Sequence, residues 1–353
     1  MGHGTVADLD ESRARARAVV SDEVLRVALD LDGSLESLGN SMTELATALE
    51  DTGRCRLVRF HSASRPDPES ARLMLRPLWA PWWRYGLGPA VDRLLAPVDV
   101  VHVAGLATPP TKAVPLVVSV DDLRPLRGET KRYVRISQLR RAVGSGAVLV
   151  ASTRRASREV QEVLGVDSSR VAVVPPAVPT IAEVVDGGDV VVNVTGLVEP
   201  LIRLLPDLDR FARARAARVV VIASASLIQR VKSLGLNVTT RTRREAREAL
   251  RDARVVLHLS DGARFPSFAI AALSAGVPTL ARATSINREL LSGAAVLVDD
   301  DGEVLAALED LWGNEPRRAL LTAAGRDRAG DFAPAVAANA YVALYRDVAR
   351  DFR

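Results

Sequence analysis

The stretch of sequence that decides the fold reads Ala263-Arg-Phe-Pro-Ser-Phe-Ala-Ile-Ala-Ala-Leu-Ser-Ala-Gly-Val-Pro278. Residues 267–275 within it are predicted to form a helix, after which Gly276 and Pro278 turn the chain. Short apolar runs at 255–259 and 279–281 flank this helix on either side. A strand, a helix and a second strand in this order are typical of a parallel sheet whose strands are joined by crossover helices.

The same alternation runs through the chain in two series. The first has predicted strands at 25–31, 56–60, 98–103, 116–120 and 147–151, and a helix at 41–50. The second has predicted strands at 190–194, 218–222, 238–240, 255–259, 279–281 and 295–298, with helices at 226–234, 243–252, 267–275, 286–291 and 302–311. Helices at 315–329 and 333–348 follow. Each series predicts one Rossmann-like layer.

A proline-rich stretch at 175–179 separates the two series, because consecutive prolines continue neither a helix nor a central strand. At 353 residues, the chain is long enough for two α/β domains. We expect a flexible leader at 1–24, a first domain at 25–178, a second at 179–332, and a helix at 333–353 that crosses back to the first domain. Since open α/β sheets bind ligands beyond the carboxyl ends of their strands, function is expected in the cleft between the domains.

Composition excludes several kinds of site. Hydrophobic residues make up 48% of the chain but aromatic residues only 4%, so the interior is built mainly from Ala, Val and Leu. The single cysteine, Cys55, excludes an internal disulfide. The histidines are His3, His61, His102 and His258. Because they lack metal-ligand spacing, we predict no tightly held metal.

The charge balance gives weaker information about partners. A net charge of +4 attracts phosphates or anionic lipid but falls short of a nucleic-acid signature. Residues 1–22 lack the apolar core of a secretory signal, and no apolar run approaches the ~18 residues that span a bilayer. We therefore expect a cytoplasmic protein that is at most peripheral to the inner face of the membrane.

The order of patterns in the first half resembles retaining family 4 glycosyltransferases. Residues 25–32 and 38–49 resemble the family's first strand, glycine loop and helix, and the resemblance places Gly39 beside the donor phosphates. Residues 115–123 are similar to the strand that ends in His-Asp-Leu, with Asp121 at the histidine position. Residues 147–175 resemble the last elements of the acceptor domain. The resemblance extends from about Leu25 to the C-terminus.

The second half continues the resemblance but with substitutions. Gly196 ends a strand that resembles the one leading to the family's diphosphate-binding basic residue; Ile202 occupies that basic position, and Arg203 follows it. The stretch 263–278 is similar to the family's Glu-Gly-Phe-Gly-x-x-x-x-Glu loop and helix. Phe265, Gly276 and Pro278 match this pattern, whereas Ala263 and Ala271 stand at the two glutamate positions.

The resemblance implies a GT-B fold: two Rossmann-like domains whose parallel sheets face each other across a cleft. It also implies a nucleotide-diphosphate sugar as donor substrate, with no further cofactor. The residues that it assigns to the donor site are Gly39, Gly196, Arg203, Arg264, Phe265, Ser267 and Glu289. The catalytic residues stay unassigned, since the family's glutamates and histidine are replaced by Ala263, Ala271 and Asp121.

These substitutions have a physical cost. Alanine cannot accept a hydrogen bond from a sugar hydroxyl, and the loss of one preorganised electrostatic contact costs about 3–4 kcal/mol of barrier. Ser267 is a suitable N-cap for the following helix, whose N-terminus favours an anion. Arg264 either pairs with a phosphate or is a structural or solvated arginine. Asp261 either compensates for the lost carboxylates or belongs to a turn with Gly262.

Residues 78–85 hold three of the four tryptophans, Trp79, Trp82 and Trp83. This cluster is suited to a bilayer interface or to stacking on a sugar or lipid acceptor. Core packing or an interface with a partner protein explains it equally well.

Two functions follow from the sequence. The first is a glycosyltransferase-like protein that transfers a sugar, with retention, from a nucleotide-diphosphate sugar to a glycan or lipid-linked acceptor. The alternative is an inactive GT-B pseudoenzyme that serves as partner or regulatory subunit of an active glycosyltransferase. A nucleotide-sugar epimerase is disfavoured, because the sequence offers no candidate histidine or glutamate for acid–base chemistry in the cleft.

Overall fold

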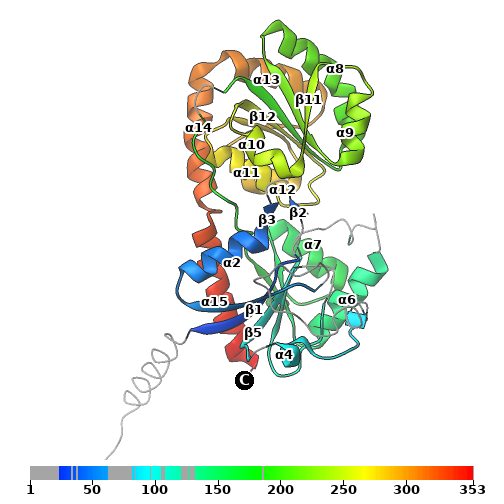
Figure 1. Cartoon of the computed structure of the whole chain (residues 1–353), viewed down its shortest axis with the longest axis vertical. Helices are drawn as coiled ribbons and strands as arrows, with labels where there is room; N and C mark the ends of the chain where they lie inside the picture. Colours follow the sequence, from blue (N-terminus) through cyan, green and yellow to red (C-terminus); the bar gives the residue numbers. More distant parts are fainter. Residues whose placement is uncertain are drawn as a thin grey trace, which may run out of the picture.

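The computed structural model describes residues 24–32, 35–36, 39–62, 82–83, 85–95, 97–104, 108–120, 126, 132–184 and 187–352. The leader predicted at 1–24 lies outside these residues, apart from Val24. The described chain forms two α/β layers stacked end to end, one built from each half of the sequence (Figure 1).

The first layer is a six-stranded parallel sheet with the order β4-β1-β5-β6-β7-β8. Its strands are β1 (Leu25–Asp30), β4 (Cys55–Phe60), β5 (Val100–Val103), β6 (Leu116–Val120), β7 (Val148–Ala151) and β8 (Val171–Val173). The helices around it are α2 (Ser41–Asp51), α4 (Val91–Leu94), α6 (Arg132–Gly144) and α7 (Arg154–Leu164). Strands β5 and β6 are buried along their whole length, which explains their near-continuous Val and Leu content.

The second layer repeats this plan with the strand order β11-β10-β9-β12-β13-β14, again all parallel. Its strands are β9 (Asp189–Thr195), β10 (Arg218–Ala223), β11 (Val238–Thr242), β12 (Ala253–Ser260), β13 (Thr279–Arg282) and β14 (Val296–Val298). Its helices are α8 (Val198–Ala214), α9 (Ala225–Lys232), α10 (Ala246–Ala249), α11 (Ser267–Ser274), α12 (Ser285–Leu291), α13 (Gly302–Gly313) and α14 (Glu315–Gly330). In place of the single helix predicted at 243–252, a 3-10 turn, Arg243–Glu245, precedes the short α10.

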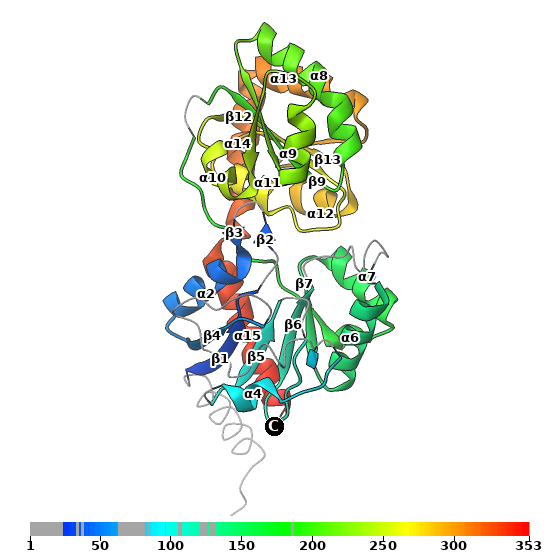
Figure 2. The same cartoon turned by 45° about the vertical axis from the view of Figure 1, so that its right-hand side comes forward.

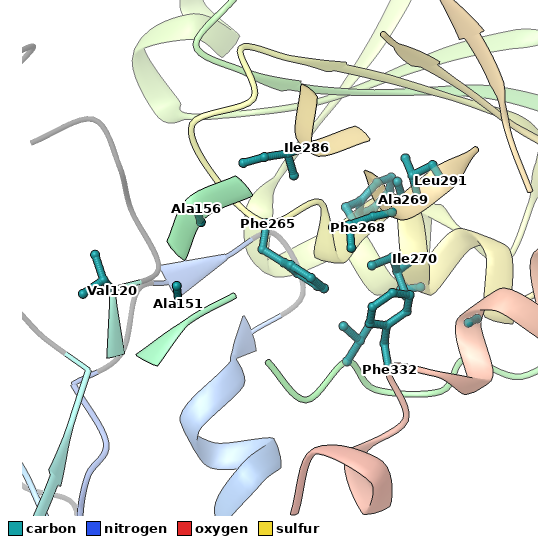
Figure 3. Packing of buried hydrophobic residues seen from close by; sticks show 14 of the residues in the cluster. Val120, Ala151, Ala156, Phe265, Phe268, Ala269, Ile270, Ile286, Leu291 and Phe332 are labelled. Carbon is teal, nitrogen blue, oxygen red and sulfur yellow. The ribbon is translucent and has the colours of Figure 1, made fainter. Parts of the chain in front are cut away.

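The junction between the layers is formed by loops and helix ends. The short antiparallel pair β2 (Leu35–Glu36) and β3 (Gly39–Asn40) follows β1 and lies between the first layer and helices α11 and α12 in both views (Figures 1 and 2). A continuous cluster of buried apolar side chains runs through both layers and includes Val120, Ala156 and Phe265 (Figure 3). The two layers are therefore held together at the junction by buried apolar side chains as well as by the chain segments that connect them.

The last helix, α15 (Pro334–Phe352), leaves the second layer and packs on α2 and β5 of the first (Figure 2). Its buried residues include Ala338, Tyr341 and Tyr345, which share one apolar cluster with Val27 and Leu45. The face of the first sheet that carries α2 is thus completed by a helix from the other end of the described chain.

A buried polar network fastens α15 to the sheet. His102 on β5 contacts the Tyr345 hydroxyl through Nδ1 at 2.7 Å and the Ser119 hydroxyl through Nε2 at 2.8 Å. The Ser119 hydroxyl also lies 3.3 Å from the hydroxyl of Tyr341. Burial lowers the pKa of His102 to about 3, so this imidazole is neutral in the folded protein near neutral pH.

The low pKa of His102 predicts how stability depends on pH. Below pH 6.5, the unfolded chain takes up a proton at His102 that the folded chain does not. The contribution of neutral His102 to the free energy of unfolding is therefore fully present above pH 6.5 and is lost as the pH falls toward 3. His102→Gln removes the titration. Between about pH 5.5 and 4, we expect the free energy of unfolding of the wild type to fall relative to this variant by about 1.4 kcal/mol per pH unit. Urea unfolding at several pH values measures this slope, and a pH-independent difference would contradict a buried, neutral His102.

Candidate functional site

A small cavity lies at the carboxyl ends of β9 and β12, where α11 begins. Its volume is about 30 Å³. It is lined by Asn193, Thr195, Arg243, His258, Arg264, Phe265, Ser267 and Phe268. None of these eight residues is acidic, and two carry guanidinium groups. The cavity is therefore built to receive an anionic or hydrogen-bond-accepting group.

The N-terminus of α11 forms one side of the cavity. The prediction that Ser267 caps this helix is wrong: Pro266 occupies the cap position, and Ser267 is the first helical residue. The Ser267 amide donates to the Phe265 carbonyl at 3.0 Å, because Pro266 turns the chain tightly into the helix. Ser267 is buried and lines the cavity, so its hydroxyl and the positive end of the helix dipole lie on the same side.

Both positions at which the resemblance expects glutamate are completely buried. Ala263 and Ala271 each expose 0% of their surface. All residues of α11 from Ser267 to Leu273 are buried, since the helix packs on β12 and β13 and against α14. Ala271 belongs to the apolar cluster that runs through both layers, so apolar packing surrounds this position.

Gly196 and Asp261 meet at the rim of the β9 and β12 ends. Gly196 has a φ of +80°, and a Cβ atom at this position would lie 1.9 Å from Oδ2 of Asp261. The other carboxylate oxygen of Asp261 accepts the Ala263 amide at 2.9 Å. The turn interpretation of Asp261 is therefore supported, and Gly196 is required by close approach as well as by its left-handed backbone.

Arg203 and Gly39, which the resemblance assigns to the donor site, do not line this cavity. Arg203 on α8 has a 68% exposed side chain and approaches Asp301 at 3.6 Å. Ile202 packs at the edge of the second layer's core. Gly39 belongs to β3 at the junction. Asp121, at the family's histidine position, lies outside the described residues.

Glu289 joins the two domains. Its Oε1 accepts the backbone N–H of Arg154 at 2.8 Å, and its Oε2 accepts that of Arg155 at 3.0 Å. These amides open α7 in the first domain, where Thr153 is the N-cap, whereas Glu289 belongs to α12 in the second. A carboxylate at a helix N-terminus satisfies orphan donors and interacts favourably with the dipole. Glu289 is thus engaged in an interdomain contact.

Sequence reasoning missed several lining residues. His258 and Asn193 belong to strands β12 and β9, Arg243 begins the 3-10 turn that follows β11, and none of the three belongs to the motif at 263–278. One signal was present, since His258 interrupts an otherwise apolar strand and so places a polar ring inside the sheet.

A second polar cluster at the ends of β1 and β4 was also missed. Asp32 Oδ1 lies 3.0 Å from Nδ1 of His61, and the Asp30 carboxylate accepts both the hydroxyl and the amide of Ser62, at 2.5 and 3.1 Å. Burial raises the pKa of Asp30 to about 6. His61 directly follows strand β4, and the sequence indicated no role for it beyond the absence of metal-ligand spacing.

The tryptophans differ in their surroundings. Trp83 is fully buried and donates from its indole nitrogen to the Pro89 carbonyl at 3.0 Å, so the core-packing explanation holds for this residue and membrane contact by Trp83 is excluded. Trp82 is 54% exposed, and Tyr85 and Leu87 nearby in sequence are 60% and 53% exposed. Trp79 lies outside the described residues. In the described part of the chain, no helix is both long and apolar enough to cross a bilayer. The expected absence of a metal stays a prediction.

The interdomain contact of Glu289 predicts a local effect. Glu289→Gln keeps the size of the side chain but removes its charge, so the N-terminus of α7 loses about 1–2 kcal/mol of stabilisation. We expect the amides of Arg154 and Arg155 to exchange with deuterium about tenfold faster. Glu162→Gln, on the exposed side of the same helix, is the matched control and should leave these rates unchanged. Equal exchange in both variants would contradict the contact.

The burial of Ala271 predicts that restoring the family glutamate does not restore a site. Ala271→Glu places a carboxylate in apolar packing, and we expect the free energy of unfolding to fall by about 3–5 kcal/mol. Ala214→Glu, at an exposed position of α8, should change it by less than about 0.5 kcal/mol. Both changes are measurable by urea unfolding. An Ala271→Glu protein as stable as the wild type would show that the site has room for an acid.

Comparisons with known proteins bear on this architecture. Residues 38–181 match the model of Glycosyltransferase Family 4. No curated protein matches the sequence. Among solved structures, HepE from Anabaena, in complex with UDP and glucose, is similar at 14% identity and a TM-score of 0.63, over 91% of this chain and 99% of that one.

Two further solved structures are similar to this chain over nearly their whole length. Sucrose-phosphate synthase from Thermosynechococcus elongatus is similar at 13% identity and a TM-score of 0.68, over 92% of this chain and 98% of that one. WaaG, a glycosyltransferase involved in lipopolysaccharide biosynthesis, is similar at 15% identity and a TM-score of 0.66, over 90% and 98%. At such identities the likeness establishes the fold, and with the two parallel sheets it confirms the predicted architecture. The chain therefore has a GT-B fold, and its residues 38–181 match Glycosyltransferase Family 4.

Proposed function

We propose that this protein binds a nucleotide-diphosphate sugar, with the diphosphate at the cavity beside α11. The observation that carries the proposal is the pairing of two guanidinium groups, from Arg243 and Arg264, with the N-terminus of a buried helix. Guanidinium groups bind phosphate through paired hydrogen bonds, and a helix N-terminus adds backbone donors and a favourable dipole. The UDP in the HepE structure supports the same class of ligand.

In the proposed reaction, the hydroxyl oxygen of a glycan or lipid-linked acceptor bonds to the anomeric carbon on the face from which the nucleoside diphosphate departs, so the configuration is retained. The bond between sugar and diphosphate breaks, and the proton of the acceptor hydroxyl passes to an oxygen of the departing diphosphate. Arg243 and Arg264 would stabilise the negative charge that develops on the leaving diphosphate. This stabilisation of the leaving diphosphate requires no carboxylate. In the proposal the protein is cytoplasmic, and the exposed Trp82, Tyr85 and Leu87 support contact with the inner face of a membrane.

A second candidate function is favoured by a specific observation. The resemblance assigns two glutamates to the sugar, but Ala263 and Ala271 are buried without exposed surface, and no acid lines the cavity. A protein of this kind would bind a nucleotide sugar without turning it over. It would then act as a partner or regulatory subunit of an active glycosyltransferase.

Calorimetric titration with UDP, GDP and their glucose conjugates tests the proposal. We expect binding, and we expect Arg264→Gln to weaken it by about ten- to hundredfold, since a hydrogen bond to a charged group contributes about 1.5–3 kcal/mol. Arg210→Gln is the matched control, because Arg210 lies on α8 with a 79% exposed side chain. It should change the affinity by less than threefold.

The outcomes separate the two candidates. Release of UDP or GDP in the presence of an acceptor extract supports a transferase, whereas binding without release supports the pseudoenzyme. Absence of binding at millimolar ligand would overturn both.

A further inference from the structure

His258 is a buried histidine whose hydrogen bonding defines which ring nitrogen carries the proton. The residue lies on β12, exposes 3% of its surface and lines the cavity. Its Nδ1 is 3.2 Å from the side-chain nitrogen of Asn193, which is buried on the neighbouring strand β9. An amide nitrogen can only donate a hydrogen bond, so Nδ1 accepts and the ring proton is on Nε2. His258 therefore presents an Nε2–H donor.

This donor lacks an acceptor among the described residues. Nε2 of His258 is buried and makes no hydrogen bond there. Buried donors without acceptors are rare and unfavourable, and they call for an explanation. His102, the other fully buried histidine in the described chain, has both ring nitrogens bonded to hydroxyls. His258 thus differs from His102 in having one ring nitrogen without a hydrogen bond among the described residues.

The surroundings of His258 specify the kind of group that would accept this hydrogen bond. Burial lowers the pKa of His258 to about 4, so the ring is a neutral donor near pH 7. Arg243 and Arg264 add positive charge, and Thr195 and Ser267 add hydroxyl groups. At about 30 Å³, the cavity holds one or two water-sized groups, which is too small for a sugar ring but sufficient for the oxygens of one anionic group.

We propose that His258 Nε2–H donates to an anionic oxygen of the ligand, either phosphoryl or carboxylate, and that Asn193 is the positioning residue that holds the required tautomer. The inference rests on the proposed function for the identity of the ligand as a nucleotide sugar. In this proposal the protein donates the hydrogen bond to the ligand, whereas the resemblance implies that the protein accepts it. Glutamates accept hydrogen bonds from sugar hydroxyls, whereas this cavity, with alanine at both glutamate positions, offers donors to an acceptor.

The test is calorimetric titration of the full chain with four probes: inorganic pyrophosphate, UDP, UDP-glucose and UDP-glucuronate. His258→Leu fills a similar volume but has no donor, and we expect it to weaken binding by about ten- to hundredfold. His258→Gln keeps an amide donor and should recover at least part of the affinity. Thermal unfolding of each variant with and without probe checks that both remain folded.

The four probes distinguish the source of the anionic oxygen. Weakening of pyrophosphate and UDP binding by His258→Leu identifies a phosphoryl group, and weakening of UDP-glucuronate binding alone identifies a carboxylate. Long-range proton–nitrogen NMR of the wild type reads the tautomer directly, and an Nε2–H signal that shifts on addition of pyrophosphate is expected. Asn193→Leu should reduce the fraction of this tautomer.

Two results would overturn the inference. In the first, His258→Leu changes the affinity for each of the four probes by less than threefold. The proposed function would still be supported in that case if UDP bound. The other is an absence of binding by every probe, which would overturn both proposals. Pyrophosphate binding that depends on His258, without UDP or UDP-sugar binding, would support the anion site and reject the nucleotide-sugar function.

Discussion

Helix α11 is buried on every face from Ser267 to Leu273, and the arrangement of the molecule follows from this constraint. Its apolar side chains must be covered on all sides, by β12 and β13, by α14 and by the junction, where Phe265 packs edge-on against Phe332 at 5.6 Å between ring centroids (Figure 3). A carboxylate on such a helix would lie in apolar packing, so alanine at position 271 is what the packing demands. The polar groups of the site are confined to the first turn of the helix and to the strand ends beside it.

Polar contacts between the domains are placed where they cost little desolvation. Glu289 meets the exposed end of α7, and Arg247 of α10 pairs with Glu44 of α2 at 3.2 Å with half of the Arg247 side chain exposed. Exposed ion pairs contribute little free energy, whereas a carboxylate on two helix amides is directional. The apolar cluster therefore supplies the adhesion between domains, and Glu289 supplies the orientation.

Much of the fold could be predicted because parallel βαβ units are local: each strand, helix and turn is contiguous in sequence. Arg264, Phe265 and Ser267 were found because they share one motif. Arg243 and His258 were not, because they reach the cavity from the turn after β11 and from β12, and only the sheet order β11-β10-β9-β12 brings them near each other. Adjacent residues also diverge, since nothing local in the sequence distinguishes Trp83, which is buried, from Trp82, which is exposed. The cap of α11 was misplaced because the helix begins at Ser267 itself, one residue earlier than a Ser267 cap would require, with Pro266 at the cap position.

The return of α15 to the first sheet has a consequence for how the chain is made. Domains generally fold from the N-terminus as they leave the ribosome. Here β8 completes the first sheet at Val173, but α15 begins only at Pro334, after every strand of the second sheet has been synthesised. Until then, the apolar patch that includes Val27 and Val117 is not covered by Tyr341 and Tyr345. The nascent first domain therefore exposes apolar surface until α15 is synthesised, and its fold is completed only after the second domain has been made.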